Sequence, residues 1–128
     1  MRRTSAGSGG VCVSTTQPSR RGAASLGAGG PDTTPPAPNR NVLPPLLARI
    51  EHAGIRRDAI TILIATGLHR PATEAESREI AGDAIASAYR IVNHNARELS
   101  EHRHLGSTAS GTPVYIDERF MAADLHIT

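Results

Sequence analysis

Residues 60–71 constrain the fold of this chain more than any other stretch. The run begins with the apolar and β-branched residues 60–65, which are typical of a buried β-strand. Gly67 breaks the run, and His69 and Arg70 follow it. In open α/β sheets, ligands bind just beyond the carboxyl ends of the strands. The stretch therefore predicts a strand that presents polar side chains at a ligand-binding edge.

One helix is predicted before this strand in the sequence and another after it. The first is expected over residues 44–53, with Asn41 as its N-cap and Gly54 at its C-terminal end. The second is expected to begin after Thr73, because a threonine followed three residues later by Glu76 forms a capping box. Both helices carry an apolar stripe, which they would pack against the strand.

Further strands complete the predicted order. Gly82 would weaken or end the second helix. Apolar runs then predict short strands over residues 89–92, 112–116 and 122–127, and an isolated one at residues 11–13. Alternating helices and strands predict an α/β fold: a partial doubly wound, mostly parallel sheet with flanking helices, cut at its C-terminal side.

The chain divides by composition into a tail and one small domain. Its 128 residues allow a single domain. Residues 1–31 are rich in Gly, Ser and Arg, contain four arginines and no acid, and are expected to form a disordered tail. A basic arm that contacts an acidic partner is the alternative. Residues 32–128 form the predicted domain.

The composition excludes several classes of function. Only 2% of the residues are aromatic and no basic face is clustered, so the chain lacks the features of a nucleic-acid-binding protein. All 14 basic residues are arginine, which excludes a Schiff base. Cys12 is the single cysteine, so no internal disulfide is possible. No apolar run reaches the length of a membrane span, and the protein is expected to be cytoplasmic.

The candidate site residues lie near residues 66–70 and at Asp32. His69 is a candidate general acid/base, since histidine titrates near neutral pH; a structural capping role is the alternative. Arg70 would meet a carboxylate or phosphate, or remain solvated. Thr66 and Gly67 would lie against an anion. Asp32 would bind a ligand hydroxyl or form an Asx-turn.

The remaining histidines offer weaker candidates. His94, between two asparagines, would make either a structural hydrogen bond or a catalytic contact. His94, His102 and His104 could form a zinc site or belong to a charged, solvated stretch, and the solvated stretch is favoured because the spacing fits no compact ligand motif. His52 and His126 are expected to be structural or surface residues.

The order of several motifs resembles the N-terminal domain of the nickel-dependent lactate racemases. The resemblance covers residues 32–128. It is carried by Thr66-Gly67-Leu68-His69-Arg70-Pro71, Thr73 with Glu76, Asn93-His94, Leu105-Gly106-Ser107-Thr108, Gly111-Thr112-Pro113-Val114 and Ala123-Asp124-Leu125.

The resemblance implies a racemase or epimerase of 2-hydroxy acids. In that family a nickel-pincer nucleotide takes a hydride from the substrate α-carbon, while a histidine removes the hydroxyl proton. His69 matches that histidine. The resemblance also assigns Asp32, Thr66, Gly67 and Arg70 to the cofactor site, and a small 2-hydroxy acid as the substrate.

The chain departs from the family pattern in two ways. Pro35 stands where the family has a substrate-site arginine. The second acid/base histidine, the tethering lysine and the nickel-ligating histidine are expected beyond residue 128. We therefore expect a fragment that is inactive alone and needs the missing C-terminal part as its partner. The alternative is a non-catalytic α/β module that binds a nucleotide or a partner chain.

Overall fold

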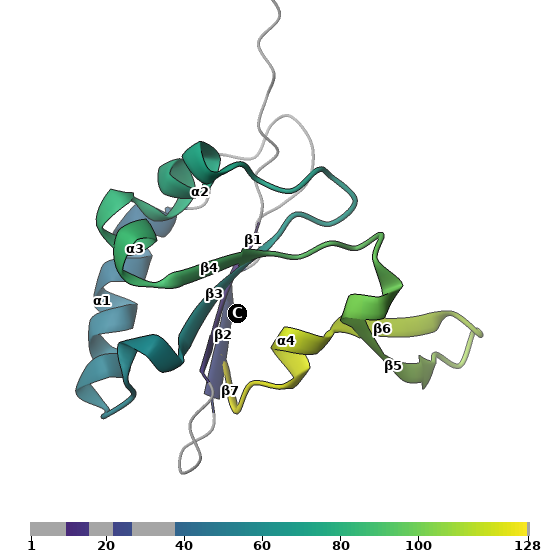
Figure 1. Cartoon of the computed structure of the whole chain (residues 1–128). Coiled ribbons are helices and arrows are strands. Elements are labelled where there is room, and N and C mark those ends of the chain that lie inside the picture. Colours follow the sequence, from purple (N-terminus) through teal and green to yellow (C-terminus); the bar gives the residue numbers. More distant parts are fainter. Residues whose placement is uncertain (1–9, 16–21, 27–37, 128) are drawn as a thin grey trace, which may run out of the picture.

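The computed structural model describes residues 10–15, 22–26 and 38–127 (Figure 1). Five strands form the main sheet, in the order β2-β7-β1-β3-β4. Their bounds are β1 Gly10–Thr15, β2 Gly22–Leu26, β3 Ile60–Ala65, β4 Arg90–Asn93 and β7 Leu125–Ile127. A separate hairpin consists of β5 His102–Ser107 and β6 Pro113–Asp117. The helices are α1 Asn39–His52, α2 Glu74–Ala81, α3 Asp83–Ala88 and α4 Glu118–Met121.

The main sheet is mostly parallel, as predicted. β3 is parallel to β4 and β2 is parallel to β7. β1 is antiparallel to β2, β3 and β7, so four described strands run in one direction and β1 runs in the other. The α/β fold class is confirmed.

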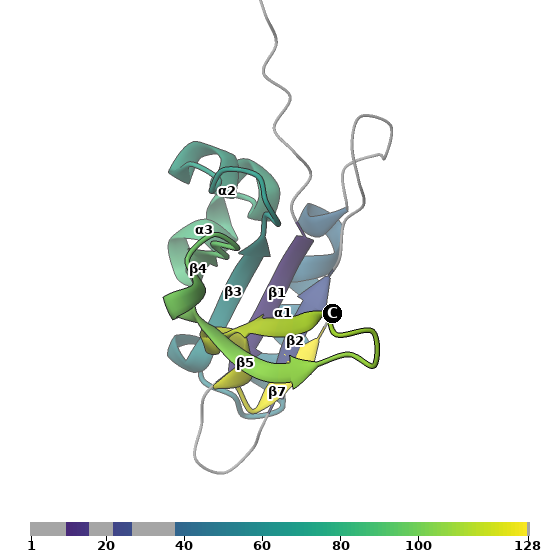
Figure 2. The same ribbon diagram turned by 90° about the vertical axis from the view of Figure 1, so that its right-hand side faces the viewer.

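The connections cover both faces of the sheet. The β3–β4 connection runs through α2 and α3 on the face that α1 also covers (Figure 1). The β4–β7 connection runs through the β5–β6 hairpin and α4 on the opposite face, where the hairpin crosses in front of the strands (Figure 2). The connections that follow the carboxyl ends of the adjacent parallel strands β3 and β4 therefore cross opposite faces of the sheet.

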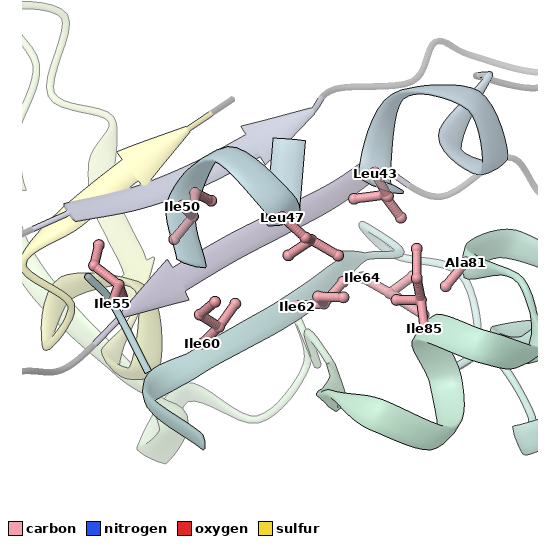
Figure 3. Packing of buried hydrophobic residues seen from close by; sticks show 9 residues of the cluster. All are labelled: Leu43, Leu47, Ile50, Ile55, Ile60, Ile62, Ile64, Ala81 and Ile85. Carbon is pink, nitrogen blue, oxygen red and sulfur yellow. The ribbon is translucent and has the colours of Figure 1, made fainter. Parts of the chain in front are cut away.

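One apolar core joins the helices to the sheet. Leu43, Leu47 and Ile50 lie on one face of α1 and meet Ile60, Ile62 and Ile64 of β3 (Figure 3). Ala81 of α2 and Ile85 of α3 complete this side. Alternate residues of β3 contact the helices because successive side chains of a strand point to opposite faces. Burying the three isoleucines favours folding by about 2 kcal/mol each.

The end of α1 matches the prediction, but its start does not. The amide of Gly54 donates to the carbonyl of Glu51 (2.9 Å) and the amide of Ile55 to that of Ile50 (3.3 Å), which is a Schellman motif. The expected N-cap at Asn41 is wrong, because the helix begins at Asn39 and contains Pro44 and Pro45. Burial of Leu43 in the core compensates for the amide hydrogen bonds that the prolines cannot donate.

The second helix is divided as its glycine suggests. The Thr73–Glu76 capping box is present at the start of α2. Gly82 ends α2 with φ of +90°, a conformation that favours glycine, and α3 follows directly. Three elements were not predicted: β2 lies in the expected tail, β5 begins in a stretch that looked only polar, and α4 precedes the expected last strand.

The expected tail also contains strands. Gly10–Thr15 and Gly22–Leu26 lie in the main sheet, so the prediction of disorder over residues 1–31 does not hold for these two segments. The predicted strand at residues 11–13 is confirmed within β1. In the part of the chain that the structure describes, no helix is long and apolar enough to cross a membrane.

Candidate functional site

His69 lies in the exposed loop that follows β3. A turn fixes its backbone, because the amide of His69 donates to the carbonyl of Thr66 (3.1 Å). Gly67, inside this turn, has φ of +57°. Within the described ranges, the imidazole of His69 makes no hydrogen bond, ion pair or ring contact, and it is exposed. The side chain is therefore accessible for proton exchange with a bound molecule.

The ends of β3 and β4 are tied together beneath this loop. The Thr66 hydroxyl donates to the carbonyl of His94 (3.0 Å), and the amide of His94 donates to the carbonyl of Ile64 (2.9 Å). The guanidinium of Arg97 donates to the carbonyl of Leu68 (3.3 Å). Thr66 is 8% exposed, so its hydroxyl serves the joint between the strands.

Arg70 contacts an acidic side chain within its own loop and helix. Its guanidinium donates to both carboxylate oxygens of Glu76, at 2.7 and 2.5 Å. The hydrogen bonds from Arg70, and secondly those from Thr73, lower the pKa of Glu76 to about 2. Arg70 remains largely exposed. It would have to exchange Glu76 for a ligand in order to bind the expected anion.

Asn93 holds the loop in a second place. Its side-chain amide donates to the carbonyl of Ala72 (3.0 Å), and its side-chain oxygen accepts from the amide of Ala72 (2.9 Å). This two-point contact joins the last residue of β4 to the segment that leads into α2. The loop from residue 66 to residue 73 is thus attached to β4 near both of its ends.

A charge cluster around the buried Asp117 lies where the hairpin meets the sheet. Asp117 is 4% exposed, and its carboxylate contacts His94 Nδ1 (3.0 Å) and accepts from Arg119 Nε (2.9 Å). Arg119 also donates to Glu101 (2.8 Å). Burial alone would raise the pKa of Asp117, but the hydrogen bonds from Arg119 and His94 outweigh it and lower the pKa to about 2.

The sequence did not indicate Asp117 as a site residue. The available local signal is that Asp117 precedes a short helix, where its side chain accepts from the amide of Arg119 as an N-cap. Its contact with His94 spans 23 positions and depends on tertiary structure. His94 makes the structural hydrogen bond that was one of the two roles expected for it.

His94, His102 and His104 have separate partners in the structure. The rings of His94 and His102 meet edge to face, with centroids 4.9 Å apart, whereas His104 stacks on Tyr115. His102 Nδ1 contacts the carbonyl of Glu98 (2.8 Å). Among the described residues, no group of three His, Cys, Asp or Glu is placed to hold a metal ion.

The other features considered for a site lie apart from His69 or outside the described residues. His52 is exposed on α1, and His126 is exposed and contacts the carbonyl of Phe120 (2.6 Å). A pocket of about 460 Å³ lies between α2, α3 and β4, and its lining does not include His69. Asp32 and Pro35 lie outside the described residues, so the predictions made for them stay predictions.

Comparison with known proteins places most of this chain in one group. The family described as "Lactate racemase N-terminal domain" matches residues 30–128. A protein named lactate racemase from Lactiplantibacillus plantarum is 36% identical over 98 residues, which are 76% of this chain and 23% of that protein. One of the same name from Thermoanaerobacterium thermosaccharolyticum is 33% identical over 94 residues, 73% of this chain and 22% of that protein.

The matched region is a limited part of these relatives. The chain spans less than a quarter of the length of either lactate racemase. No solved structure matches it. The whole loop from Thr66 to Thr73 and the charge cluster at Asp117 fall inside the matched residues.

Proposed function

Because this chain belongs to the lactate racemase N-terminal domain family, we propose that it contributes the proton-transferring part of a racemase acting on a 2-hydroxy acid. The observation that carries the proposal is the position of His69. His69 is exposed beyond the carboxyl end of β3, at the edge where ligands bind in open α/β sheets, and it lies inside the matched segment. Lactate is the first substrate to test, since both relatives carry its name.

His69 would act as a general base and then as a general acid. Its neutral imidazole would accept the hydroxyl proton of one enantiomer as the α-carbon is oxidised, and would return the proton when the 2-keto acid is reduced on the same face. The second acid/base histidine that the resemblance implies would serve the other enantiomer. The turn closed by Thr66 and His69 limits the freedom of the backbone. The free ring retains the rotation that it needs to reach a substrate bound above the sheet.

The redox half of the reaction is not assigned to any described residue. The resemblance ascribes it to a nickel-pincer nucleotide, which accepts a hydride when bound. The described residues contain no donor set for a metal ion, so they do not fit the nickel part of that group. In the complete enzyme the nickel would have to be held by residues other than those described.

A chimaeric enzyme tests the proposal. Residues 30–128 would replace the matching segment of the L. plantarum lactate racemase, and interconversion of D- and L-lactate would be followed. We expect His69→Asn to lower kcat at least about 100-fold, which is the lower end of the range for the loss of a general base. His52→Asn, at an exposed position on α1, is the control and should retain activity.

Pro35 provides a second arm of this experiment. Pro35→Arg introduces the arginine that the resemblance expects at the substrate site, and it should raise kcat/KM of the chimaera. A folded chimaera that is inactive with Pro35 and with Arg at this position would contradict the proposed function. So would a His69→Asn variant with unchanged kcat.

A further inference from the structure

We propose that Asp117 and His94 form a positioning device for the loop that carries His69, with His94 held as the tautomer that has its hydrogen on Nδ1. Neither residue is assigned a catalytic role. The importance of the device for proton transfer rests on the proposed function, whereas its existence rests on the contacts alone. The two residues lie 23 positions apart and join the hairpin to the end of β4.

The first link of the device fixes the His94 ring. Asp117 is buried, and its Oδ2 lies 3.0 Å from His94 Nδ1. Its carboxylate is ionised at neutral pH because its pKa lies near 2. An ionised carboxylate only accepts hydrogen bonds, so Nδ1 must carry the hydrogen. When the ring is neutral, Nε2 then carries the lone pair and can accept a hydrogen bond.

The second link runs through the backbone of the same residue. The amide and carbonyl of His94 contact Ile64 and Thr66, at 2.9 and 3.0 Å. Fixing the His94 ring therefore also fixes the carbonyl that orients the Thr66 hydroxyl. Since Thr66 is 8% exposed, this hydroxyl has little access to water as a substitute partner.

The third link reaches the candidate catalytic residue. The carbonyl of Thr66 accepts from the amide of His69 at 3.1 Å, and Gly67 between them has φ of +57°. Leu68, in the same turn, is 71% exposed and adds no core packing. The turn therefore depends on polar contacts, and the route from Asp117 through His94 and Thr66 supplies a continuous set of them.

A simpler role for Asp117 would be to hold the hairpin and α4 together. That role is shared by other residues of the same segment, because Arg119 contacts both Asp117 and Glu101, and Arg103 pairs with Glu118 between β5 and α4. These ion pairs stay within the segment, whereas the contact between Asp117 and His94 reaches the end of β4. Arg119→Gln therefore separates the two roles, because it removes contacts within the segment but neither partner of the contact between Asp117 and His94.

NMR of the complete 128-residue chain tests the inference. The ¹⁵N shifts of the His94 ring should show hydrogen on Nδ1 at neutral pH in the wild-type protein. Asp117→Ala, which removes both carboxylate oxygens, and Thr66→Val should each speed hydrogen exchange at the His69 amide about fivefold, the factor for one ordinary hydrogen bond. Thr66→Ser, which keeps the hydroxyl, and Arg119→Gln should leave that exchange close to the wild-type rate.

Three results would overturn the inference. The first is hydrogen on Nε2 of His94 in the wild-type protein. The second is an unchanged exchange rate of the His69 amide in Asp117→Ala, and the third is equal effects of Arg119→Gln and Asp117→Ala on that rate. Exchange at Ile62, in the middle of β3, distinguishes a local change from general unfolding. If Asp117→Ala does not fold, the ¹⁵N shifts of the His94 ring and the comparison of Thr66→Val with Thr66→Ser still test the inference. None of these measurements depends on turnover, so the proposed function can fail separately.

Discussion

Arg70 and Glu76 form a two-point ion pair across the entry to α2, with the Arg70 guanidinium 2.7 and 2.5 Å from the two carboxylate oxygens. The same carboxylate accepts from the amide of Thr73 (2.8 Å) and so closes the capping box. The Glu76 carboxylate therefore both caps the N-terminus of α2 and pairs with the arginine that is expected to bind an anion. Anion binding at Arg70 would compete with this internal pair.

Glu76→Gln should expose that competition. Glutamine can still accept from the Thr73 amide, so the capping box and α2 should persist. The charge that holds Arg70 is lost, and the guanidinium should become available to an added anion. We expect inorganic phosphate to shift the Arg70 Nε–H NMR signal more strongly in the variant than in the wild-type protein.

Glu74→Gln is the matched control for this change. Glu74 also lies in the first turn of α2, but it pairs with Arg78 (3.0 Å) rather than with Arg70. In Glu74→Gln, phosphate should shift the Arg70 Nε–H signal as much as it does in the wild-type protein. Identical responses in the wild-type protein and Glu76→Gln would show that the ion pair does not limit access to Arg70.

Acid should destabilise the protein through Asp117. The pKa of this group is about 2 in the folded protein, below its ordinary value of 3.8, so the folded state binds the proton more weakly. Its contribution to stability, of the order of 2 kcal/mol, is present above pH 4 and is lost as the pH falls toward 2. Urea unfolding between pH 7 and pH 2 would measure this loss.

Asp117→Asn serves as the comparison in that titration. It removes the ionisable group, so the variant should be less stable at pH 7 and should show a smaller fall in stability between pH 4 and pH 2. Parallel curves for the two proteins would mean that other carboxylates account for the acid sensitivity.

Core packing makes a separate prediction at Ile62. This side chain is fully buried between β3 and the helices. Ile62→Val should lower the free energy of unfolding by about 1 kcal/mol, because it removes one methylene from a close-packed core. Leu68→Ala changes a side chain that is 71% exposed and should alter stability by less than about 0.5 kcal/mol. Urea unfolding at neutral pH measures both.

Local sequence signals were sufficient to predict structure that depends on interactions within one helix or strand. The apolar run of β3, the Thr73–Glu76 capping box and the glycine at position 54 each act within a few residues, and each was predicted. The early start of α1 was missed because burial of Leu43 outweighs the effect of two prolines. Helix propensity alone does not include that tertiary contribution.

Long-range contacts limited what could be predicted for the site. The sequence placed His69, Thr66 and Gly67 at the end of a strand, and the structure agrees. It did not indicate that Asp117 would reach His94, or that Arg70 would already have a partner in Glu76. Such contacts depend on how the hairpin and α2 pack against the strand ends. The roles assigned to His69, Asp32, Thr66, Gly67 and Arg70 stay predictions.

Gly67 provides the most direct test of the loop that carries His69. Its φ of +57° is unfavourable for residues with a side chain, but among the described residues, its two chain neighbours aside, no atom lies within 4 Å of where a Cβ would be. Gly67→Ala should therefore cost about 1 kcal/mol through backbone strain alone, without a steric clash. Gly67→Asn should cost less, because asparagine tolerates this conformation better. Urea unfolding of both variants gives the costs, and a much larger loss for alanine would show that the loop is packed more closely than the structure indicates.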